Sequence, residues 1–442
     1  MSTPLPAIAV LGASGLIGEA VASRLLQEGF PVVPIARRFN AAQKTAFAKG
    51  VVECPLVALD AAALARVLAA HDVEIVVNCI GVLQDGHRGS TDAVHRAFVE
   101  RLIAALGSRA EPVLLIHLSI PGDSEDDPTS FSRTKRAAER MIAAASLPFV
   151  ILRPGFVIAP AAYGGSALIR ALAVLPFDLP AGEAQQALAI TDVADIARTI
   201  AFIARRWRDG ERHWNAVWDV MARQPSTVAE VVVAFRRGLG GPKRRLALPS
   251  TLMQPAARAG DLVAHLGWSP PLRSTALLEM RRGVAGDPAP WIAATGIEPA
   301  SLAESVRLLP QTVQEKWFAR LYLTKPLILA SLSAFWALSG FIALTAAYGP
   351  ATEILTSRGF SAGLAGAVTV ASSLLDISVG LALAIRRTCR IGLLAGIGVS
   401  LFYMIAAAVL TPALWIEPLG ALVKTGPAIV LMLVALAVLE DR

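Results

Sequence analysis

Apolar residues follow two different patterns along the chain. Up to about residue 287, short apolar runs alternate with stretches in which apolar residues recur at helical spacing. After residue 325 the apolar runs become much longer and almost free of charge. The first pattern is typical of buried strands alternating with helices, and the second of helices that cross a membrane. The pattern therefore predicts an α/β part followed by a helical membrane part.

The first part is predicted to be a doubly wound α/β domain with a parallel sheet. Strands are expected at 7–11, 31–36, 51–56, 74–79, 113–118 and 149–155, and helices at 16–28, 61–70 and 92–106. Trp214 and Trp218, after His213, stand four positions apart, which fits the alternation of a strand. Such alternation is more typical of the core face of a strand than of a substrate platform.

Four apolar runs predict an all-α four-helix transmembrane bundle over residues 324–442. They cover 326–352, 359–385, 391–416 and 425–439, and Asp376 is the only charged residue inside them. Three of them exceed the roughly 20 residues that span a bilayer. The fourth reaches that length only if 419–423 joins it, with Lys424 snorkelling or facing the bundle interior. A buried helical core domain is the alternative, which such long uncharged runs disfavour. Residues 288–323 are expected to form an amphipathic juxtamembrane connector.

Composition and charge narrow the class of protein. The chain is 55% hydrophobic and 17% charged, which is too apolar for a purely soluble protein. Its net charge of +7 includes paired basic residues between 236 and 282, which suit a surface resting on anionic lipid. Nucleic acid is disfavoured as a partner because no nucleic-acid-binding module accompanies them. The three cysteines are widely separated, so we expect reduced thiols and no metal site.

The distribution of basic residues predicts the orientation in the membrane. The sequence before the first strand has no basic segment of the kind that begins a secretory signal. Basic residues precede the first span and fill the loop between the second and third: Lys316, Arg320, Lys325, Arg386, Arg387 and Arg390. By the positive-inside rule, we expect a multi-pass protein of the inner (cytoplasmic) membrane. The α/β domain and both termini are expected in the cytoplasm.

A glycine-rich turn lies between the first expected strand and the first expected helix. Glycines at 12, 15 and 18 let the turn fold sharply and let backbone amides approach a pyrophosphate at the helix N-terminus. This strand-turn-helix context predicts a dinucleotide site. Its expected cofactor-binding residues are Gly12, Ser14, Gly15, Leu16, Ile17 and Gly18.

Arg37 and Arg38 follow the second expected strand, where an acidic residue would bind the ribose hydroxyls of NAD. Their charge and forked donors suit a 2′-phosphate instead, so NADP is the preferred cofactor and NAD the alternative. An ordinary solvated arginine pair is the other interpretation.

Three motifs together resemble the extended and atypical short-chain dehydrogenase/reductase superfamily. They are the GxxGxxG spacing, the Arg-Pro-Gly turn at 153–155, and the segment 190–194, where a short strand meets a helix capped by an aspartate. The resemblance implies a Rossmann domain over residues 1–287, with a substrate-side subdomain from about 159. It also implies that Asp60 contacts the adenine, although a helix cap is the simpler role, and that Asn78 and Gly81 line the cofactor.

The resemblance implies a catalytic serine, tyrosine and lysine, and here one of them is replaced. Ser119 follows the fifth expected strand and Lys135 stands in the next helix, but Phe131 occupies the tyrosine position. Phenylalanine cannot exchange a proton, so cofactor binding is expected to survive better than catalysis. Ser132 or Tyr163 is a candidate substitute, neither supported by a motif.

The membrane part resembles the DoxX-like family of four-helix membrane proteins through segments 376–380 and 415–420, with Lys424 and Pro427. Some relatives are linked to quinone chemistry. An intramembrane carboxylate is costly, so Asp376 is expected to face the interior. Its candidate partners there are Lys424 by charge and Tyr403 by hydroxyl. It either pairs with Lys424 to fix packing or serves a quinone-like headgroup. The candidate membrane-site residues are Asp376, Tyr403, Glu417 and Lys424.

Two functions remain open. One is a membrane-anchored NAD(P)(H)-binding oxidoreductase that acts on a lipophilic, quinone-like substrate. The other is a catalytically impaired nucleotide-binding scaffold or assembly factor with protein partners at the respiratory membrane. The second is suggested by a resemblance to the nucleotide-binding accessory subunit of respiratory complex I, and Phe131 favours it.

Overall fold

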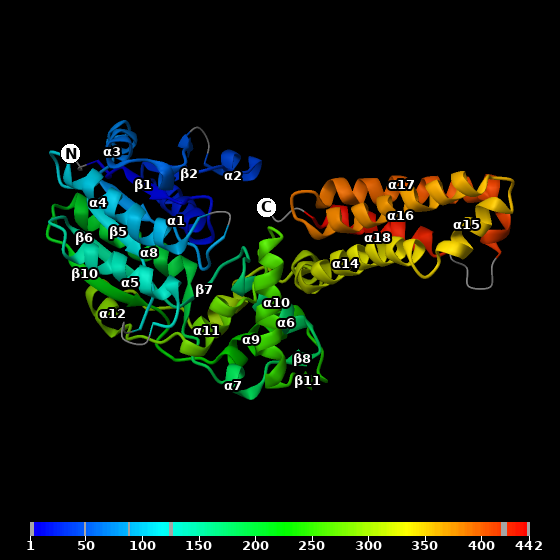
Figure 1. Ribbon diagram of the computed structural model, residues 1–442. Coiled ribbons are helices and arrows are strands. Elements are labelled where there is room, and N and C mark those ends of the chain that lie inside the picture. The colour runs from blue at the N-terminus through cyan, green and yellow to red at the C-terminus, as the bar shows by residue number, and fades with distance from the viewer. Residues whose placement is uncertain (1–3, 48–49, 87–88, 123–126, 417–421, 440–442) are drawn as a thin grey trace. The chain divides into compact units, whose positions relative to one another are not determined.

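The computed structural model describes residues 4–47, 50–86, 89–122, 127–416 and 422–439. The chain forms two compact units (Figure 1). The first comprises Met1–Asp261 and Pro270–Ala319, and the second Leu262–Ser269 and Arg320–Arg442.

The first unit is built on a parallel sheet of seven strands in the order β10-β6-β5-β4-β1-β2-β3. The strands are β1 (Ile8–Leu11), β2 (Val32–Ala36), β3 (Val52–Glu53), β4 (Ile75–Asn78), β5 (Leu114–Leu118), β6 (Phe149–Pro154) and β10 (Asn215–Val220). This order is that of a doubly wound fold, as predicted. The expected strand 51–56 is only two residues long, because the short helix η2 (Leu56–Ala58) follows it.

Helices cover both faces of this sheet (Figure 1). One hydrophobic core contains residues of α1 (Leu16–Gln27) and α8 (Val193–Arg208). The other contains residues of α3 (Ala61–Ala69), α4 (Phe98–Gly107) and α5 (Ser130–Ala143). Burial on both faces explains why the strands read as unbroken apolar runs. Trp214 and Trp218 lie in the first core, 6.1 Å apart and edge to face, which confirms the prediction of a strand core.

A smaller lobe follows β6. It contains the parallel pairs β7 (Phe156–Ile158) with β9 (Ile190–Asp192) and β8 (Phe177–Asp178) with β11 (Leu246–Ala247). Its helices are α6 (Gly165–Val174), α7 (Ala181–Ala184), α9 (Val228–Leu239), α10 (Met253–His265) and α11 (Ser274–Arg282). Asp192 caps α8 by accepting a hydrogen bond of 2.9 Å from the Ala194 amide, as the sequence motif predicts.

The compact first unit continues past the expected boundary at 287. It includes α12 (Ala289–Thr295), α13 (Leu302–Arg307) and the start of α14 (Val313–Leu344). Trp291 has no exposed surface and donates a hydrogen bond of 3.0 Å to the Thr199 hydroxyl. Residues 288–319 therefore pack as part of this unit.

The second unit is a helical bundle of α14, α16 (Ala362–Ala384), α17 (Cys389–Leu410) and α18 (Thr425–Ala437), with the shorter α15 (Tyr348–Thr356). Among the described residues, α14, α16 and α17 are long and apolar enough to cross a membrane. The first predicted span ends at Leu344 rather than 352, because α15 is a separate helix. The second and third spans are close to their predictions.

The fourth predicted span is short, as expected for its apolar run taken alone. Helix α18 has 13 residues, about 20 Å at 1.5 Å per residue, against a hydrocarbon core of about 30 Å. Residues 422–424 form a turn instead of extending the helix. Segment 417–421, which includes Glu417, lies outside the described residues.

Small residues let α14 and α16 approach closely. A Cβ at Gly380 would lie 2.6 Å from the Ala337 nitrogen, and one at Gly340 would lie 2.4 Å from the Ser373 carbonyl oxygen. Ser333 adds a hydrogen bond of 2.8 Å to the Gly380 carbonyl. Such contacts are the usual means of helix association in lipid, where hydrophobic burial contributes little.

Candidate functional site

The glycine-rich turn has the shape of a backbone cradle. Gly12 has a φ of +79°, in the left-handed region that favours glycine. Its carbonyl accepts a hydrogen bond of 2.9 Å from the Gly15 amide. A Cβ at Gly18 would lie 2.3 Å from the same carbonyl oxygen, so only glycine fits there. Gly15 begins α1 without a side-chain cap, which leaves the amides of the first turn for a ligand. These features fit a dinucleotide pyrophosphate.

The short helix α2 (Ala41–Ala46), which the sequence analysis did not predict, fixes this turn from outside. The Gln43 side chain is buried and donates hydrogen bonds to the Ser14 carbonyl (3.3 Å) and to Glu19 (2.6 Å). Asn40 and Gln43 cap α2 reciprocally. The chain after β2 therefore holds the glycine loop in place.

Arg37 and Arg38 follow β2 directly, and both are exposed. The acidic group of the neighbouring strand, Glu53, accepts a hydrogen bond of 2.9 Å from the Phe39 amide and pairs with Lys44 at 2.9 Å. The Phe39 amide and then Lys44 hold the pKa of Glu53 below its ordinary value. Glu53 is thus committed to other partners, and the two arginines leave this edge of the sheet positive.

The other expected cofactor contacts have structural partners. Asp60 caps α3 by accepting a hydrogen bond of 2.7 Å from the Ala63 amide, and it is exposed. Asn78 is buried. It donates a hydrogen bond to the His117 ring (3.1 Å) and accepts one from the Ile80 amide (3.1 Å). Asn78 therefore shapes the turn after β4, and its side chain faces the protein interior.

Gly81, in the same turn, faces a buried histidine and a buried lysine. A Cβ at Gly81 would lie 3.5 Å from the Lys135 Nζ and 3.6 Å from the His95 Nε2. Gly12 in turn approaches Ile80, because a Cβ there would lie 3.1 Å from the Ile80 side chain. These contacts join the glycine-rich turn to Lys135.

Lys135 and Ser119 lie at the carboxyl end of β5. Lys135 donates a hydrogen bond of 2.8 Å to the Leu118 carbonyl, and only 5% of the residue is exposed. Burial lowers the pKa of Lys135 to about 8. Ser119 follows β5 directly, is 6% exposed, and donates its amide to the Leu152 carbonyl at 2.8 Å. A lysine with this pKa exchanges a proton readily near neutral pH.

His95 is a site residue that the sequence analysis missed. It lies in a π-helical turn, Asp92–Ala97, at the start of the helix expected at 92–106. Its Nε2 accepts a hydrogen bond of 3.1 Å from the Val82 amide, and its Nδ1 lies 2.9 Å from the Thr134 hydroxyl. Burial, aided by the nearby charge of Lys135, lowers the pKa of His95 to about 3. The ring is therefore neutral. π-Turns often mark functional sites, but no local sequence signal announces one.

Phe131 occupies the tyrosine position with its ring packed on His95, edge to face at 5.5 Å. Ser132, one candidate substitute, is fully buried and bonds to Thr129 and, at 2.8 Å, to Glu279. Its hydroxyl therefore serves the capping box of α5. The main-chain amide of Tyr163, the other candidate, donates to the Ser166 hydroxyl at 2.8 Å.

A buried ion network supports the loop after Ser119. Arg136 donates to the carbonyls of Ile120 (2.8 Å) and Pro121 (2.7 Å). Arg153, from the Arg-Pro-Gly turn, pairs with Glu139 at 2.6 Å. Burial alone would raise the pKa of Glu139, but the hydrogen bonds from Arg153 and the charges of Arg153 and Arg136 hold it below its ordinary value.

The interior of the bundle contains one carboxylate among its described residues. Asp376 is 9% exposed and accepts a hydrogen bond of 2.9 Å from the Tyr403 hydroxyl. Lys424 is exposed just before α18, and no ion pair joins it to Asp376. The expectation of an Asp376–Lys424 pair is therefore wrong, because α18 starts after Lys424 and leaves it at the surface. Ser373 and Trp336 are also buried here, each with a polar atom that has no hydrogen-bond partner among the described residues.

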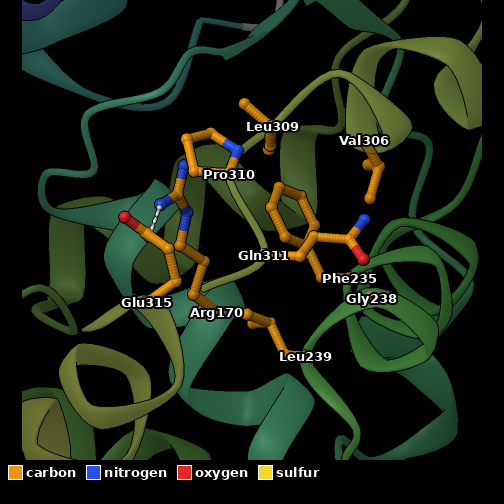
Figure 2. Close-up of a pocket in the computed structure, with 9 residues that line it drawn as sticks. All are labelled: Arg170, Phe235, Gly238, Leu239, Val306, Leu309, Pro310, Gln311 and Glu315. Atoms are coloured by element: carbon orange, nitrogen blue, oxygen red, sulfur yellow. Dashed lines mark hydrogen bonds and ion pairs between the residues drawn. The ribbon is translucent and has the colours of Figure 1, made fainter. Parts of the chain in front are cut away.

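The first unit also contains a small pocket, and none of the predicted site residues lines it (Figure 2). Arg170 of α6 pairs across it with Glu315 of α14 at 2.8 Å, donates to the Ala159 carbonyl at 2.7 Å, and lies over the Phe235 ring. Its charge is thus already satisfied by the protein. We interpret this pocket as a packing joint between α6, α9 and the start of α14. Among the described residues, no cluster of His, Cys, Asp and Glu could hold a metal ion.

Comparisons with known proteins agree with this geometry. Residues 12–200 match a family described as NAD(P)H-binding, and residues 333–433 match the DoxX-like family. A dTDP-6-deoxy-L-talose 4-dehydrogenase (NAD(P)(+)) of Kitasatospora kifunensis is 29% identical over 217 residues, which cover 44% of this chain and 67% of that protein.

Solved structures of nucleotide-sugar epimerases are similar in fold. The UDP-glucose 4-epimerase of Stenotrophomonas maltophila, with bound NAD, is 15% identical and matches with a TM-score of 0.52 over 73% of this chain and 99% of its own. The UDP-glucuronic acid 4-epimerase of Bacillus cereus is 14% identical, with a TM-score of 0.50 over 72% of this chain and 100% of its own. At these identities the likeness concerns the fold alone.

Proposed function

We propose that this chain, which joins an NAD(P)-binding Rossmann domain of the short-chain dehydrogenase/reductase type to a DoxX-like membrane domain, is an oxidoreductase for a lipophilic substrate. The observation that carries the proposal is the position of Lys135. Its buried ammonium group lies at the end of β5, where Ser119 follows, and close to Gly81 in the turn after β4.

The residues of the cradle would hold the cofactor. The first-turn amides of α1 suit a pyrophosphate, and Arg37 and Arg38 suit a 2′-phosphate, so we favour NADP over NAD. A bound reduced nicotinamide would supply a hydride to a substrate carbonyl. Lys135 would hold the ribose hydroxyls and supply the proton. The Ser119 hydroxyl would donate a hydrogen bond to the carbonyl oxygen.

The lipophilic nature of the substrate is inferred from the membrane domain. Asp376 and Tyr403 form a hydrogen-bonded pair of a carboxylate and a hydroxyl inside a largely apolar bundle. Such intramembrane groups often mark a functional site. A quinone-like headgroup is our candidate ligand. We further propose that the protein lies in the inner membrane with the Rossmann domain and both termini in the cytoplasm, in line with the basic loop at 386–390.

A second function is favoured by Phe131, which removes the usual proton donor. The chain would then bind a nicotinamide nucleotide without turnover and act as a scaffold or assembly factor for proteins of the respiratory membrane. The two proposals share the cofactor site and differ in whether the cofactor reacts.

Mass spectrometry of the denatured full-length protein would identify the nucleotide that copurifies. Oxidation of NADPH would then be followed with lipophilic quinones and aldehydes over a range of pH. The enzyme proposal expects turnover that falls as the pH rises through about 8, because Lys135 loses its proton there. Retained nucleotide without turnover on any acceptor would support the scaffold, and absence of nucleotide would overturn both.

A further inference from the structure

One segment of the α/β part belongs to the helical unit. Residues 262–269, which begin in the last turn of α10, group with the bundle. The Trp268 indole donates a hydrogen bond of 2.7 Å to the carbonyl of Ala384, the last residue of α16. The Arg386 amide donates to the Leu266 carbonyl at 3.0 Å. The segment is thus hydrogen-bonded to the end of a helix that is long enough to span a membrane.

The outer side of this segment is apolar. Leu262 is 70% exposed, and Val263 and Leu266 are each 40% exposed. Large apolar side chains at this exposure are unfavourable in water, yet here they flank a tryptophan that bonds to the end of a spanning helix. Tryptophan at such a position is typical of the membrane–water interface.

Basic residues surround the same end of the bundle. The carbonyl of Leu439, just after α18, accepts hydrogen bonds from Lys325 of α14 (3.1 Å) and from Arg386 in the loop after α16 (3.4 Å). The Arg386 guanidinium also lies over the Trp268 ring, 5.3 Å from its centre. Arg387 and Arg390, in the same loop and first turn of α17, are exposed and form no ion pair within the described chain.

We infer that residues 262–269 form an interfacial element that binds anionic phospholipid. Leu262, Val263 and Leu266 enter the boundary between headgroups and acyl chains. Arg387 and Arg390 bind the lipid phosphate, for which the forked guanidinium is well suited. The occupant is lipid because the segment that carries the apolar side chains is hydrogen-bonded to the end of α16, a helix of spanning length, and the adjoining charges have the sign that attracts anionic headgroups.

Native mass spectrometry of the full-length protein, released from nanodiscs of mixed phosphatidylglycerol and phosphatidylcholine, tests the charge component. The parent is expected to retain phosphatidylglycerol preferentially, and Arg387→Glu combined with Arg390→Glu should reduce that preference several-fold. Arg358→Glu is the matched control, because Arg358 is exposed in the loop at the other end of α16. Equal retention of both lipids by the parent, or an equal loss in the control, would overturn the inference.

Fluorescence quenching tests the apolar component. A fluorophore at Val263→Cys should be quenched by lipids brominated in the acyl chain, whereas one at Val217→Cys should not. The two valines are similarly exposed, at 40% and 42%. If the Val263→Cys variant fails to fold, Leu262→Cys repeats the test. Folding of each variant is checked by whether it retains the nucleotide. Equal quenching at 217 and at 263 or 262, or no quenching at 263 and 262, would contradict insertion.

Discussion

At the scale of single residues, the chemistry depends on one missing hydroxyl. Phe131 keeps the ring of the expected tyrosine and packs it on His95, but it has no proton to give. Phe131→Tyr is therefore expected to raise turnover on a suitable carbonyl by about a hundredfold to ten-thousandfold, the usual worth of general acid catalysis. Steady-state oxidation of NADPH measures this.

Phe131→Leu is the control for this prediction, since it changes the packing without adding a donor. Cofactor affinity should stay close to that of the parent in both variants. The assignment of the active site would be wrong if the parent turned over at rates ordinary for the family and neither Ser119→Ala nor Lys135→Ala changed those rates.

The Asp376–Tyr403 pair permits a second residue-scale prediction. Tyr403→Phe removes the hydrogen bond between α17 and α16, which should lower stability in detergent by about 0.6 kcal/mol and at most about 1.7 kcal/mol. Asp376→Asn keeps the shape of the acceptor and removes its charge, which weakens the hydrogen bond from Tyr403, so a purely structural Asp376 predicts a loss of stability in this variant as well. Thermal unfolding of the purified protein measures both.

Ligand retention separates a functional carboxylate from a structural one. If Asp376 serves a ligand, Asp376→Asn should abolish retention of that ligand or activity while the fold survives. If it is structural, stability should fall instead. A variant equal to the parent in stability, retained lipid and activity would contradict both roles.

At the scale of elements, the turn between β1 and α1 depends on Gly18. A Cβ there would lie 2.3 Å from the Gly12 carbonyl, so Gly18→Ala must displace α1 from the turn. We expect a loss of about 1–3 kcal/mol in stability, as for overpacking, together with weaker nucleotide binding. Gly107→Ala, at the end of α4, is the control because a Cβ there meets nothing within 4 Å. Calorimetric titration with the nucleotide and thermal unfolding should show a loss for Gly18→Ala and little change for Gly107→Ala. Equal losses in the two variants would refute the assignment of the glycine-rich turn as the nucleotide site.

The end of β2 should set the cofactor preference. Arg37 and Arg38 are exposed there while Glu53 is held by Phe39 and Lys44. We expect tighter binding of NADPH than NADH. Arg37→Asp should weaken NADPH binding by about tenfold or more, since a hydrogen bond to a charged group is worth roughly 1.5–3 kcal/mol. Arg244→Asp, an exposed arginine in another loop, should leave the preference unchanged. Equal affinities of the parent for NADPH and NADH in calorimetric titrations would contradict the assignment of Arg37 and Arg38 to the 2′-phosphate.

At the scale of the whole molecule, the DoxX-like match and the three helices of spanning length indicate a membrane protein. The orientation is a prediction. An impermeant thiol reagent added outside intact cells should miss Arg387→Cys and label Ser357→Cys, in a background where the native cysteines are serine. Ser357 precedes α16 and Arg387 follows it, so the two positions lie at opposite ends of this helix, and both are exposed. The reverse labelling pattern would show that the basic loop faces outward.

The sequence alone determined the features that depend on neighbouring residues. Apolar periodicity predicted six strands of the sheet, and glycine spacing predicted the strand-turn-helix unit. Both resemblances were confirmed, because motifs such as GxxGxxG and Arg-Pro-Gly are short and contiguous. The last apolar run was predicted to be short by itself, and α18 is short; hydropathy left open whether 419–423 would lengthen it, because it cannot show that a turn at 422–424 precedes α18.

Only the tertiary structure decided the contacts between distant residues. Gln43 meets Ser14 across 29 positions, and His95 meets Thr134 across 39. For Asp376 the sequence offered two partners, Lys424 and Tyr403, and the structure selected Tyr403. Helix and strand periodicity says which face of an element is apolar, but not which residue of another element lies opposite. The π-turn that carries His95 and the attachment of Trp268 to Ala384 arise from such packing, so no local pattern could have predicted them.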